Sequence, residues 1–478
     1  MSAGVLDIDV DGALPLLGNA LQILRDPLGY FPAQRARGPV VRIHIGTHPV
    51  YVLTRPELAR RVLVDDHRSY DKGGPFIKAV RQLGREGLAT CDDSTHQRQR
   101  PLMQPAFHPS NLASHTDVIR SAAAGTVGSW QDGEVLDVNR QMYALAAEIV
   151  AKTLFEHSEH VVDRLTADLP ILMGGLFRRL ILPVGWVHRL PLAANRRYDR
   201  AERAIRSAID RLIAEHDPAA QGSDLLAMIV AARSEETGEG MSDQEIHDQV
   251  MTMLVGAIET TGSLLAWTLY EVARHPEVER RLWAEIDEHT TAGQTGLDGL
   301  DGLAYTRMVL HEALRLHPPA PILSRIAVED VVLEGVRIPA GSDVLFSLYA
   351  LHRDPEVFPE PDRFDPDRWS AERFGPAQRR GFFGFSAGRR KCIGDSFAML
   401  EATVTIAAIA RTWRLRPADD RPVKPLLRTT LRPASLHMVA RLRPAHGIDG
   451  HEQSHAATAA APAPGAPRSA GCPVHGLG

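Results

Sequence analysis

The pattern of apolar and polar positions predicts a mainly helical chain with a small amount of β-sheet. Residues 40–53 form two β-rich runs broken at residues 46–49, which indicates a hairpin. Most of the remaining chain has a helical period, with Pro and Gly at the breaks. Ser242 and Glu245 form a capping box, and no proline follows before Pro276. This segment predicts one helix of roughly thirty residues or more, about 50 Å long, that serves as a core pillar.

Composition indicates a globular protein with no general affinity for nucleic acid or anionic membranes. The chain has 478 residues, is 44% hydrophobic and 24% charged, and has a formal net charge of -5. Three cysteines argue against a disulfide framework and fit a reducing compartment. The apolar stretch at residues 14–24 is interrupted and too short to span a membrane, and it lacks the basic start of a signal peptide. We therefore expect a cytoplasmic location.

No linker divides the chain before its end, so we expect one large domain over residues 11–445 after a flexible N-terminus at residues 1–10. Residues 446–478 are rich in Ala, Pro and Gly and predict a disordered tail. The tail contains Cys472 and His475, but two ligands do not complete a metal site.

The loop at residues 382–395 combines glycines, aromatic residues and consecutive cations immediately before one cysteine. Gly388 and Gly394 allow a tight turn and a close approach to a flat ligand, and a helix begins near Ser396. Arg390, Lys391 and the helix N-terminus should lower the pKa of the Cys392 thiol and favour thiolate, the form that binds iron. Taken alone, these residues also suit a reactive or simply buried cysteine beside a basic loop.

A resemblance decides between these alternatives. Phe385, Gly388, Arg390, Cys392 and Gly394 occupy every fixed position of the haem-binding signature of the cytochrome P450 superfamily. The chain resembles the soluble bacterial members over roughly residues 10–445. The resemblance implies a mainly α fold with small β-sheets, an α+β arrangement in which haem b lies between the long central helix and the cysteine loop. It also implies a haem-thiolate monooxygenase with Cys392 as the axial iron ligand.

Two further segments agree with this resemblance. Glu312 and Arg315 lie one helical turn apart, which on its own would be a surface pair. With Arg363 in the later Pro-Asp-Arg-Phe segment, they look like the family's buried ionic triad that supports the cysteine loop. The resemblance also implies that His96, Arg100 and Arg325 bind the haem propionates, although a solvated basic face would look the same. Pro101 departs from the family pattern and leaves the end of that helix open.

The middle of the predicted long helix contains poor helix formers, which indicates a function. The family has a widened turn here, where an acid and an alcohol deliver protons to bound dioxygen. The resemblance assigns these roles to Glu259 and Thr260. The usual second glycine is Ala257, so the groove at the haem is expected to be narrower. The alternative is structural: Thr260 would bond back to the carbonyl of Gly256.

The remaining predictions concern electrons and substrate. No Gly-x-Gly-x-x-Gly reductase fingerprint occurs, so electrons should come from NAD(P)H through ferredoxin reductase and a ferredoxin or flavodoxin. That partner should dock on a basic face made by Arg379, Arg380, Arg389, Arg390 and Lys391. Connecting segments resemble actinobacterial sesquiterpene oxidases; fatty acids, steroids and polyketides are alternative substrates. A non-catalytic haem sensor or helper subunit is an alternative of another class. The expected substrate-binding residues carry few charges, which favours a small apolar substrate, and are Phe76, Ile77, Val80, Leu172, Met173, Leu176, Phe177, Leu254, Ile258, Ile322, Leu323, Thr429 and Thr430.

Overall fold

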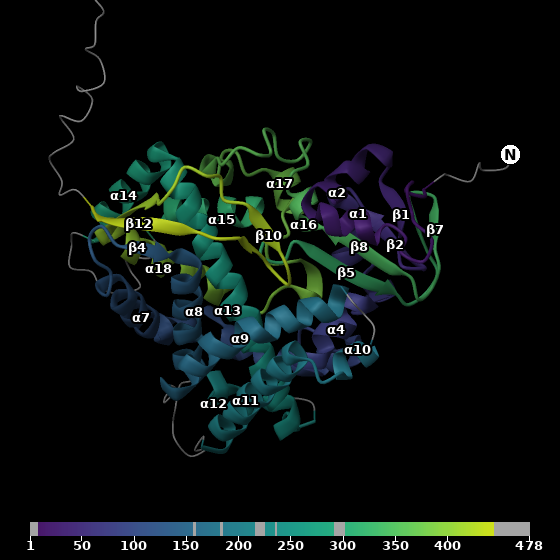
Figure 1. The fold of residues 1–478 in the computed structure, drawn as a ribbon, viewed down its shortest axis with the longest axis horizontal. Helices are drawn as coiled ribbons and strands as arrows, with labels where there is room; N and C mark the ends of the chain where they lie inside the picture. Colours follow the sequence, from purple (N-terminus) through teal and green to yellow (C-terminus); the bar gives the residue numbers. More distant parts are fainter. Residues whose placement is uncertain are drawn as a thin grey trace, which may run out of the picture. The chain divides into compact units, whose positions relative to one another are not determined.

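The computed structural model describes residues 8–155, 159–181, 185–215, 225–234, 237–290 and 302–443. Within these ranges the chain is mainly helical with four small sheets, which confirms the predicted α+β fold (Figure 1). Contacts between residues group the described part of the chain up to Leu442 into one compact unit. The predicted tail, with Cys472 and His475, lies outside the described residues.

The α-helices are α1 (Ala20–Arg25), α2 (Pro27–Ala33), α3 (Pro56–Arg60), α4 (Gly74–Gly84), α5 (Asp93–Met103), α6 (Pro109–Leu112), α7 (Thr116–Gly128), α8 (Val138–Leu154), α9 (Glu159–Ile181), α10 (Gly185–Arg189), α11 (Ala193–Glu215), α12 (Leu225–Ala231), α13 (Asp243–Arg274), α14 (Pro276–Thr290), α15 (Ala304–Leu316), α16 (Leu348–Leu351), α17 (Pro376–Gly381) and α18 (Asp395–Thr412).

The largest sheet has the strand order β1-β2-β8-β5-β3. The predicted hairpin is confirmed: β1 (Val40–Ile45) and β2 (His48–Leu53) pair antiparallel, with Ile45 opposite His48 across the turn. A second sheet has the order β4-β12-β9, and two separate hairpins are β6-β7 and β10-β11. The other strands are β3 (Tyr70–Asp71), β4 (Val135–Asp137), β5 (Ile322–Ala327), β6 (Val331–Leu333), β7 (Val336–Ile338), β8 (Asp343–Ser347), β9 (Trp413–Pro417), β10 (Pro425–Leu427), β11 (Leu431–Pro433) and β12 (His437–Leu442).

The N-terminal segment is more ordered than residues 1–10 were expected to be. The Arg42 backbone N–H donates to the Ile8 carbonyl at 2.7 Å, and Val10 N–H donates to the Arg42 carbonyl at 3.0 Å. Val10 is buried against the small core of β1 and β2. The prediction of a flexible start is therefore wrong for residues 8–10, because an apolar side chain and a backbone bridge attach them to β1.

Helix α13 is the predicted central pillar. Its N-cap Ser242 accepts a hydrogen bond from Glu245 N–H, and the Glu245 carboxylate accepts one from Ser242 N–H at 2.9 Å, so the capping box is present. The helix ends at Arg274, just before Pro276 begins α14. By length and composition α13 could cross a membrane, but 67% of its apolar window is buried inside the protein, as expected for the core helix of a globular fold.

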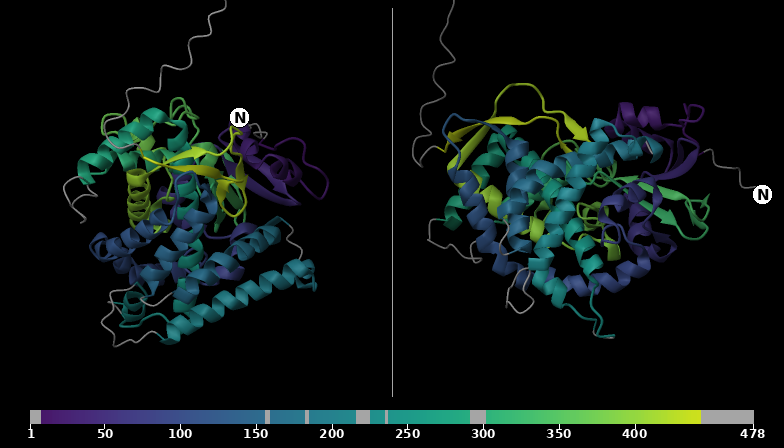
Figure 2. Two further views of the ribbon diagram at one scale, coloured as in Figure 1. Left: turned by 60° about the vertical axis from the view of Figure 1, so that its left-hand side comes forward. Right: turned by 60° about the horizontal axis from the view of Figure 1, so that its bottom comes forward.

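Two hydrophobic cores meet along α13. The N-terminal half of the helix, including Val250 and Leu254, packs with α8, α9 and α11. The C-terminal half, including Leu265 and Trp267, packs with α7, α15 and α18. Helices α9 and α11 lie side by side in both orientations of the ribbon (Figure 2). The middle of α13 therefore lies at the boundary between the two cores. A ligand could bind at this boundary without disrupting the packing of either core.

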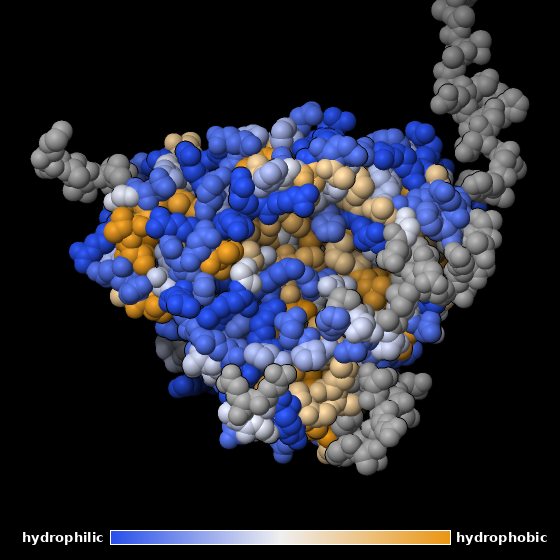
Figure 3. Space-filling view, turned by 180° about the vertical axis from the view of Figure 1, so that it is seen from behind, coloured by the Kyte–Doolittle hydropathy of each residue, from blue (hydrophilic) through white to orange (hydrophobic). Residues whose placement is uncertain are grey.

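The face shown in Figure 3 is mostly hydrophilic, with hydrophobic residues gathered in separate patches. Within the described residues, the large exposed apolar side chains include Leu16 and Leu17 in the N-terminal segment and Trp186 in α10. Scattered exposure of this kind is ordinary for a globular surface.

Candidate functional site

The cysteine loop between α17 and α18 folds back on itself. The Cys392 N–H donates to the Phe385 carbonyl at 2.9 Å, and the Lys391 N–H donates to the Gly388 carbonyl at 3.0 Å. Gly388 has a φ of +69°, and a Cβ added there would come within 2.0 Å of the Leu63 carbonyl oxygen. The close approach at Gly388 is therefore to the protein's own backbone, and glycine is required for both conformation and space.

Gly394 differs from Gly388. Its φ is negative, and an added Cβ would meet only the Phe107 ring, at 3.8 Å. Neither backbone conformation nor contacts within the described protein require glycine at this position. The predicted role of Gly394, close approach to a flat ligand, stays a prediction.

The expected lowering of the Cys392 pKa is wrong for the polypeptide itself. Desolvation raises the pKa of the thiol. The hydrogen bond from Gly394 N–H and the charges of Arg100 and Lys391 lower it, as predicted for Lys391, but by less. Arg390 turns away from the sulfur and donates to Asp71 Oδ1 at 2.8 Å and to the Cys91 carbonyl at 3.0 Å. A bound metal cation would be the charge that makes the thiolate stable.

A cluster of cations lies between β3, α5, β5 and the cysteine loop. Desolvation, followed by the charges of Arg390, Arg100, Lys72 and Arg325, lowers the pKa of His96 to about 3. Burial and the charge of Arg390 lower the pKa of Arg325 to about 10. Lys72 was not among the predicted site residues, yet burial and the charges of Arg325 and Arg390 lower its pKa well below the ordinary value. Neighbouring cations repel each other, and an anion bound between them offsets that repulsion. The side chains of His96, Arg325 and Lys72 therefore fit the two carboxylates of haem.

Arg100 connects α5 to the cysteine loop. Its Nη1 donates to the Lys391 carbonyl at 2.6 Å, and its Nε donates to Gln104 Oε1 at 3.2 Å. Helix α5 continues past Pro101 to Met103 and then tightens into a 3-10 turn at Gln104–Phe107. The proline therefore does not end the helix, and it leaves Arg100 beside the loop.

The middle of α13 opens on one side. Gly256 is exposed and Ala257 is half-buried, whereas Ile258 and Glu259 are buried. A Cβ added to Gly256 would meet nothing within 4 Å. The expected widened turn is not seen: α13 is a regular α-helix throughout, and Thr260 Oγ1 donates to the Gly256 carbonyl at 2.5 Å. That bond back to the preceding turn is the structural alternative considered for Thr260.

The carboxylate of Glu259 points to a different set of partners. Its Oε2 accepts hydrogen bonds from Thr429 Oγ1 at 3.1 Å and Thr430 Oγ1 at 3.2 Å, both at the turn between β10 and β11. Burial raises the pKa of Glu259 against the lowering effect of these two bonds. The structure thus places half-buried Thr260 beside the open part of α13 and buried Glu259 among other partners, Thr429 and Thr430, with no hydrogen bond between Glu259 and Thr260.

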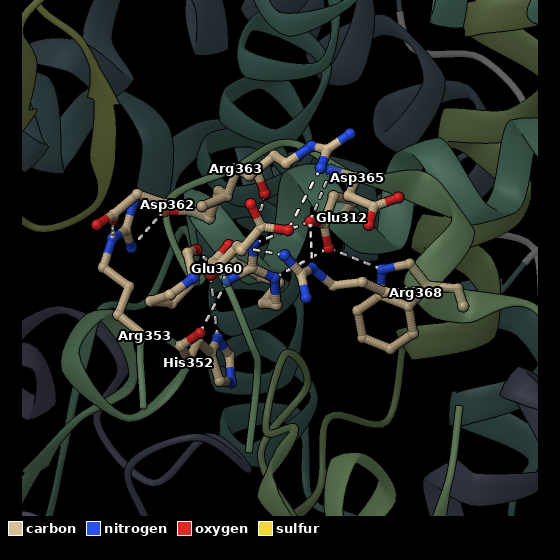
Figure 4. Close-up of polar contacts among 12 residues, drawn as sticks. Glu312, His352, Arg353, Glu360, Asp362, Arg363, Asp365 and Arg368 are labelled. Carbon is tan, nitrogen blue, oxygen red and sulfur yellow. Dashed lines mark hydrogen bonds and ion pairs between the residues drawn. The ribbon is translucent and has the colours of Figure 1, made fainter. Parts of the chain in front are cut away.

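The predicted ionic triad has a different third member (Figure 4). Glu312 and Arg315 are fully buried and paired, with Arg315 Nε 2.9 Å from Oε2 and Nη2 2.8 Å from Oε1. Arg368 completes the cluster, with Nε 3.1 Å from Glu312 Oε1. Arg363 contributes only its carbonyl oxygen, which accepts from Arg315 at 3.1 Å, while its side chain is 64% exposed and pairs with Glu360. The assignment of Arg363 is wrong, because its guanidinium points to solvent.

His352 joins this cluster to the cysteine loop. Arg315 Nη1 donates to the His352 carbonyl at 2.9 Å, and the Phe383 N–H donates to His352 Nε2 at 2.9 Å. Because Nε2 accepts, the ring proton is on Nδ1, which donates to the Arg315 carbonyl at 3.2 Å. Burial lowers the pKa of His352 to about 3, so the ring is neutral and keeps this tautomer at neutral pH.

The predicted substrate residues are only partly brought together. A cavity of about 270 Å³ includes Met173, Ile258, Thr429 and Thr430 in its lining. Leu172, Leu176 and Leu254 are buried in the core around α9 and α13, with Val80 packed against it. Ile77 is buried, Phe177 is half-buried, and Ile322 and Leu323 are half-buried in β5. The side chain of Phe76 is outside the described part of the structure.

Comparisons with known proteins agree with the geometry. The family model described as Cytochrome P450 matches residues 10–440. Cyclooctatin synthase of Streptomyces melanosporofaciens is 42% identical over 90% of this chain and 95% of its own length. Cyclooctat-9-en-7-ol 5-monooxygenase of the same species is 40% identical over 85% of this chain and 89% of its own length. Pentalenene oxygenase of Streptomyces avermitilis is 38% identical over 89% of this chain and 95% of its own length.

A solved structure gives the same result for the fold. The heme domain of a cytochrome P450DA mutant superposes with a TM-score of 0.81 at 27% identity, over 91% of this chain and 97% of that one. The chain belongs to the cytochrome P450 family and is a monooxygenase with haem b and a cysteine thiolate ligand.

Proposed function

We propose that this protein inserts an oxygen atom from O₂ into a terpene or a related small apolar molecule. The observation that carries this proposal is the similarity, along nearly the whole chain, to three oxygenases of which two are named for cyclooctatin chemistry and one for pentalenene. Half-buried apolar side chains among the predicted substrate residues, such as Val80 on α4 and Leu323 on β5, support it because they offer hydrocarbon contact without charge.

Different residues of this chain have separate roles in the proposed reaction. Cys392 would hold the haem iron, and His96, Arg100, Arg325 and Lys72 would bind the propionates. The bound haem supplies oxygen activation. Glu259 holds a proton at its buried carboxyl and passes it through water and Thr260 to the open part of α13. The apolar side chains around this part of the helix limit the access of bulk water.

The electron donor in this proposal is a separate acidic ferredoxin or flavodoxin on the face behind the cysteine loop. Three of the five predicted cations are already paired: Arg389 with Asp93, Arg390 with Asp71 and Lys391 with Asp395. Arg379 and Arg380 are exposed and form no ion pair in the described ranges. The docking charge is therefore concentrated at α17.

Two measurements test the donor. Reduction of the haem by a ferredoxin should slow as salt is added, since charges at a surface are screened over about 8 to 10 Å at moderate ionic strength. Arg379→Glu with Arg380→Glu should slow it further, while Arg411→Glu, at an exposed position on α18, should not. Equal rates in all three proteins would refute the docking face.

Binding spectra against a panel of terpenes test the substrate. A Soret shift with one or more terpenes, followed by an oxygenated product that depends on NAD(P)H and a ferredoxin system, is the expected result. Parallel titrations use a fatty acid, a steroid and a polyketide macrolactone. A shift with one of these and with no terpene would replace the terpene proposal by that substrate class. A non-catalytic haem sensor would give no product with any compound.

A further inference from the structure

A cavity of about 270 Å³ lies beside Glu259 on α13. Its walls come from the first turns of α8, the middle of α9, and the β10-β11 turn. Its lining contains neither Cys392 nor the cations predicted to bind haem, so this cavity is separate from the cysteine side of the site. Its volume is close to the lower end of small-molecule pockets, roughly 300–1,000 Å³.

The two sides of the cavity differ in chemistry. One side is apolar and consists of α9 residues, with Leu165, Leu169 and Met173 in the lining. The other carries Arg140, Arg428 and Arg432. Because like charges repel, three arginines around one cavity favour an anion between them.

No hydrogen bond or ion pair is formed by these three guanidinium groups within the described ranges, whereas Arg416, for comparison, binds Glu279 at 2.6 Å. Both carboxylates in the lining accept hydrogen bonds from groups other than these guanidiniums, although the positive charge of Arg432 lowers the pKa of Glu259. Asp137 caps α8 by accepting from the Arg140 backbone N–H at 3.2 Å, and Glu259 accepts from Thr429 and Thr430. In the described part of the chain, the N–H donors of the three guanidinium groups are therefore not used in hydrogen bonds, although the charge of Arg432 acts on Glu259.

A buried polar atom in the lining also has unused bonding capacity. Asn139 Oδ1 is buried and makes no hydrogen bond in the part of the chain that is described, whereas the Tyr143 hydroxyl interacts with Thr430. Buried polar atoms are nearly always paired in folded proteins, so Asn139 Oδ1 indicates a bound molecule or water in the cavity.

We propose that this cavity binds an amphipathic organic anion, with its carboxylate at Arg140, Arg428 and Arg432 and its apolar body against Leu165, Leu169 and Met173. Guanidinium groups match a carboxylate with paired hydrogen bonds. Arg140 and Arg428 are exposed, and exposed ion pairs alone contribute little, so the apolar contact must supply the rest of the affinity. This excludes a small inorganic anion as the preferred occupant. The site would be additional to the one at which the terpene is oxidised.

Isothermal titration of decanoate into the full-length, haem-loaded protein tests the proposal, with decan-1-ol and inorganic phosphate as the two partial probes. Decanoate should bind in a one-to-one ratio and more tightly than either. Arg428→Gln with Arg432→Gln should weaken decanoate binding by at least about tenfold, since two of the three charged contacts are lost. Arg428→Lys with Arg432→Lys should give an intermediate affinity. Arg411→Gln, a surface arginine outside the cavity, should leave it unchanged.

Three outcomes would overturn the proposal. Equal decanoate affinity in the glutamine variant and the unchanged protein would place the ligand elsewhere, and a Soret shift in both would place it at the haem. Phosphate binding as tight as decanoate would make this a site for inorganic anions. If the double variant loses haem, Arg428→Gln alone, at an exposed turn, carries the test. Terpene spectra on the same variants show whether the oxidation site is intact, so the two proposals can fail independently.

Discussion

The corrected ionic cluster makes a quantitative prediction about two arginines five positions apart. Arg368 is buried and donates to Glu312 at 3.1 Å and to the Glu360 carbonyl at 2.7 Å. Arg368→Ala removes one of the two cations that balance a fully buried carboxylate, and two charged hydrogen bonds with it. We expect the free energy of unfolding to fall by about 3 to 5 kcal/mol. Arg363→Ala removes only an exposed pair with Glu360, and should cost about 0 to 1 kcal/mol.

Denaturant titrations of the haem-loaded variants, followed by circular dichroism and haem absorbance, measure this difference. Arg363→Ala is the matched control, because the backbone carbonyl that Arg315 uses is retained. Glu312→Ala strands two buried guanidinium groups, and Arg315→Ala leaves Glu312 with one, so both should yield little haem-loaded protein. Equal losses of stability in Arg363→Ala and Arg368→Ala would refute the corrected assignment.

Other groups give further predictions. Glu401 is fully buried without a hydrogen bond in the described residues, and burial raises the pKa of its carboxyl. The folded protein then binds more protons than the unfolded one above the ordinary glutamate pKa of about 4.3, so stability falls by up to about 1.4 kcal/mol per pH unit until the folded pKa is reached. Glu401→Gln should remove that slope in urea titrations between acid and neutral pH. Lys72→Met should speed haem transfer to apomyoglobin, because a propionate partner is lost, while exposed Lys78→Met should not. Thr260→Ala should lower product formed per NAD(P)H consumed and release hydrogen peroxide; an unchanged ratio would count against a proton role.

The central features of the fold could be predicted because local sequence determines them. The capping box at Ser242, the proline at Pro276 and the alternating strands at residues 40–53 each act through neighbours in the chain. The cysteine loop could be identified because glycine at Gly388 is required by a positive φ and by the Leu63 carbonyl. At Gly388 the sequence motif and the physical requirement for glycine agree.

Long-range pairing explains what the sequence did not reveal. The segments at residues 361–364 and 366–369 both read Pro-Asp-Arg followed by an aromatic residue, and only burial shows that Arg368 is the inward one. Arg390 was expected to act on the thiol, but Asp71, which lies far away in sequence, binds it. Lys72 follows Asp71 in a short turn, and its place in the cation cluster depends on β5. The three arginines in the lining of the cavity beside Glu259 come from two distant segments, so the sequence alone does not show that they lie together.

The absorption spectrum of the reduced, carbon monoxide-treated protein tests the central claim most directly. With Cys392 as the axial thiolate, the Soret band should lie at the long wavelength typical of thiolate ligation, and Cys392→Ser should lose that band. Absence of the band in the unchanged protein, or its persistence in Cys392→Ser, would contradict iron ligation by this sulfur.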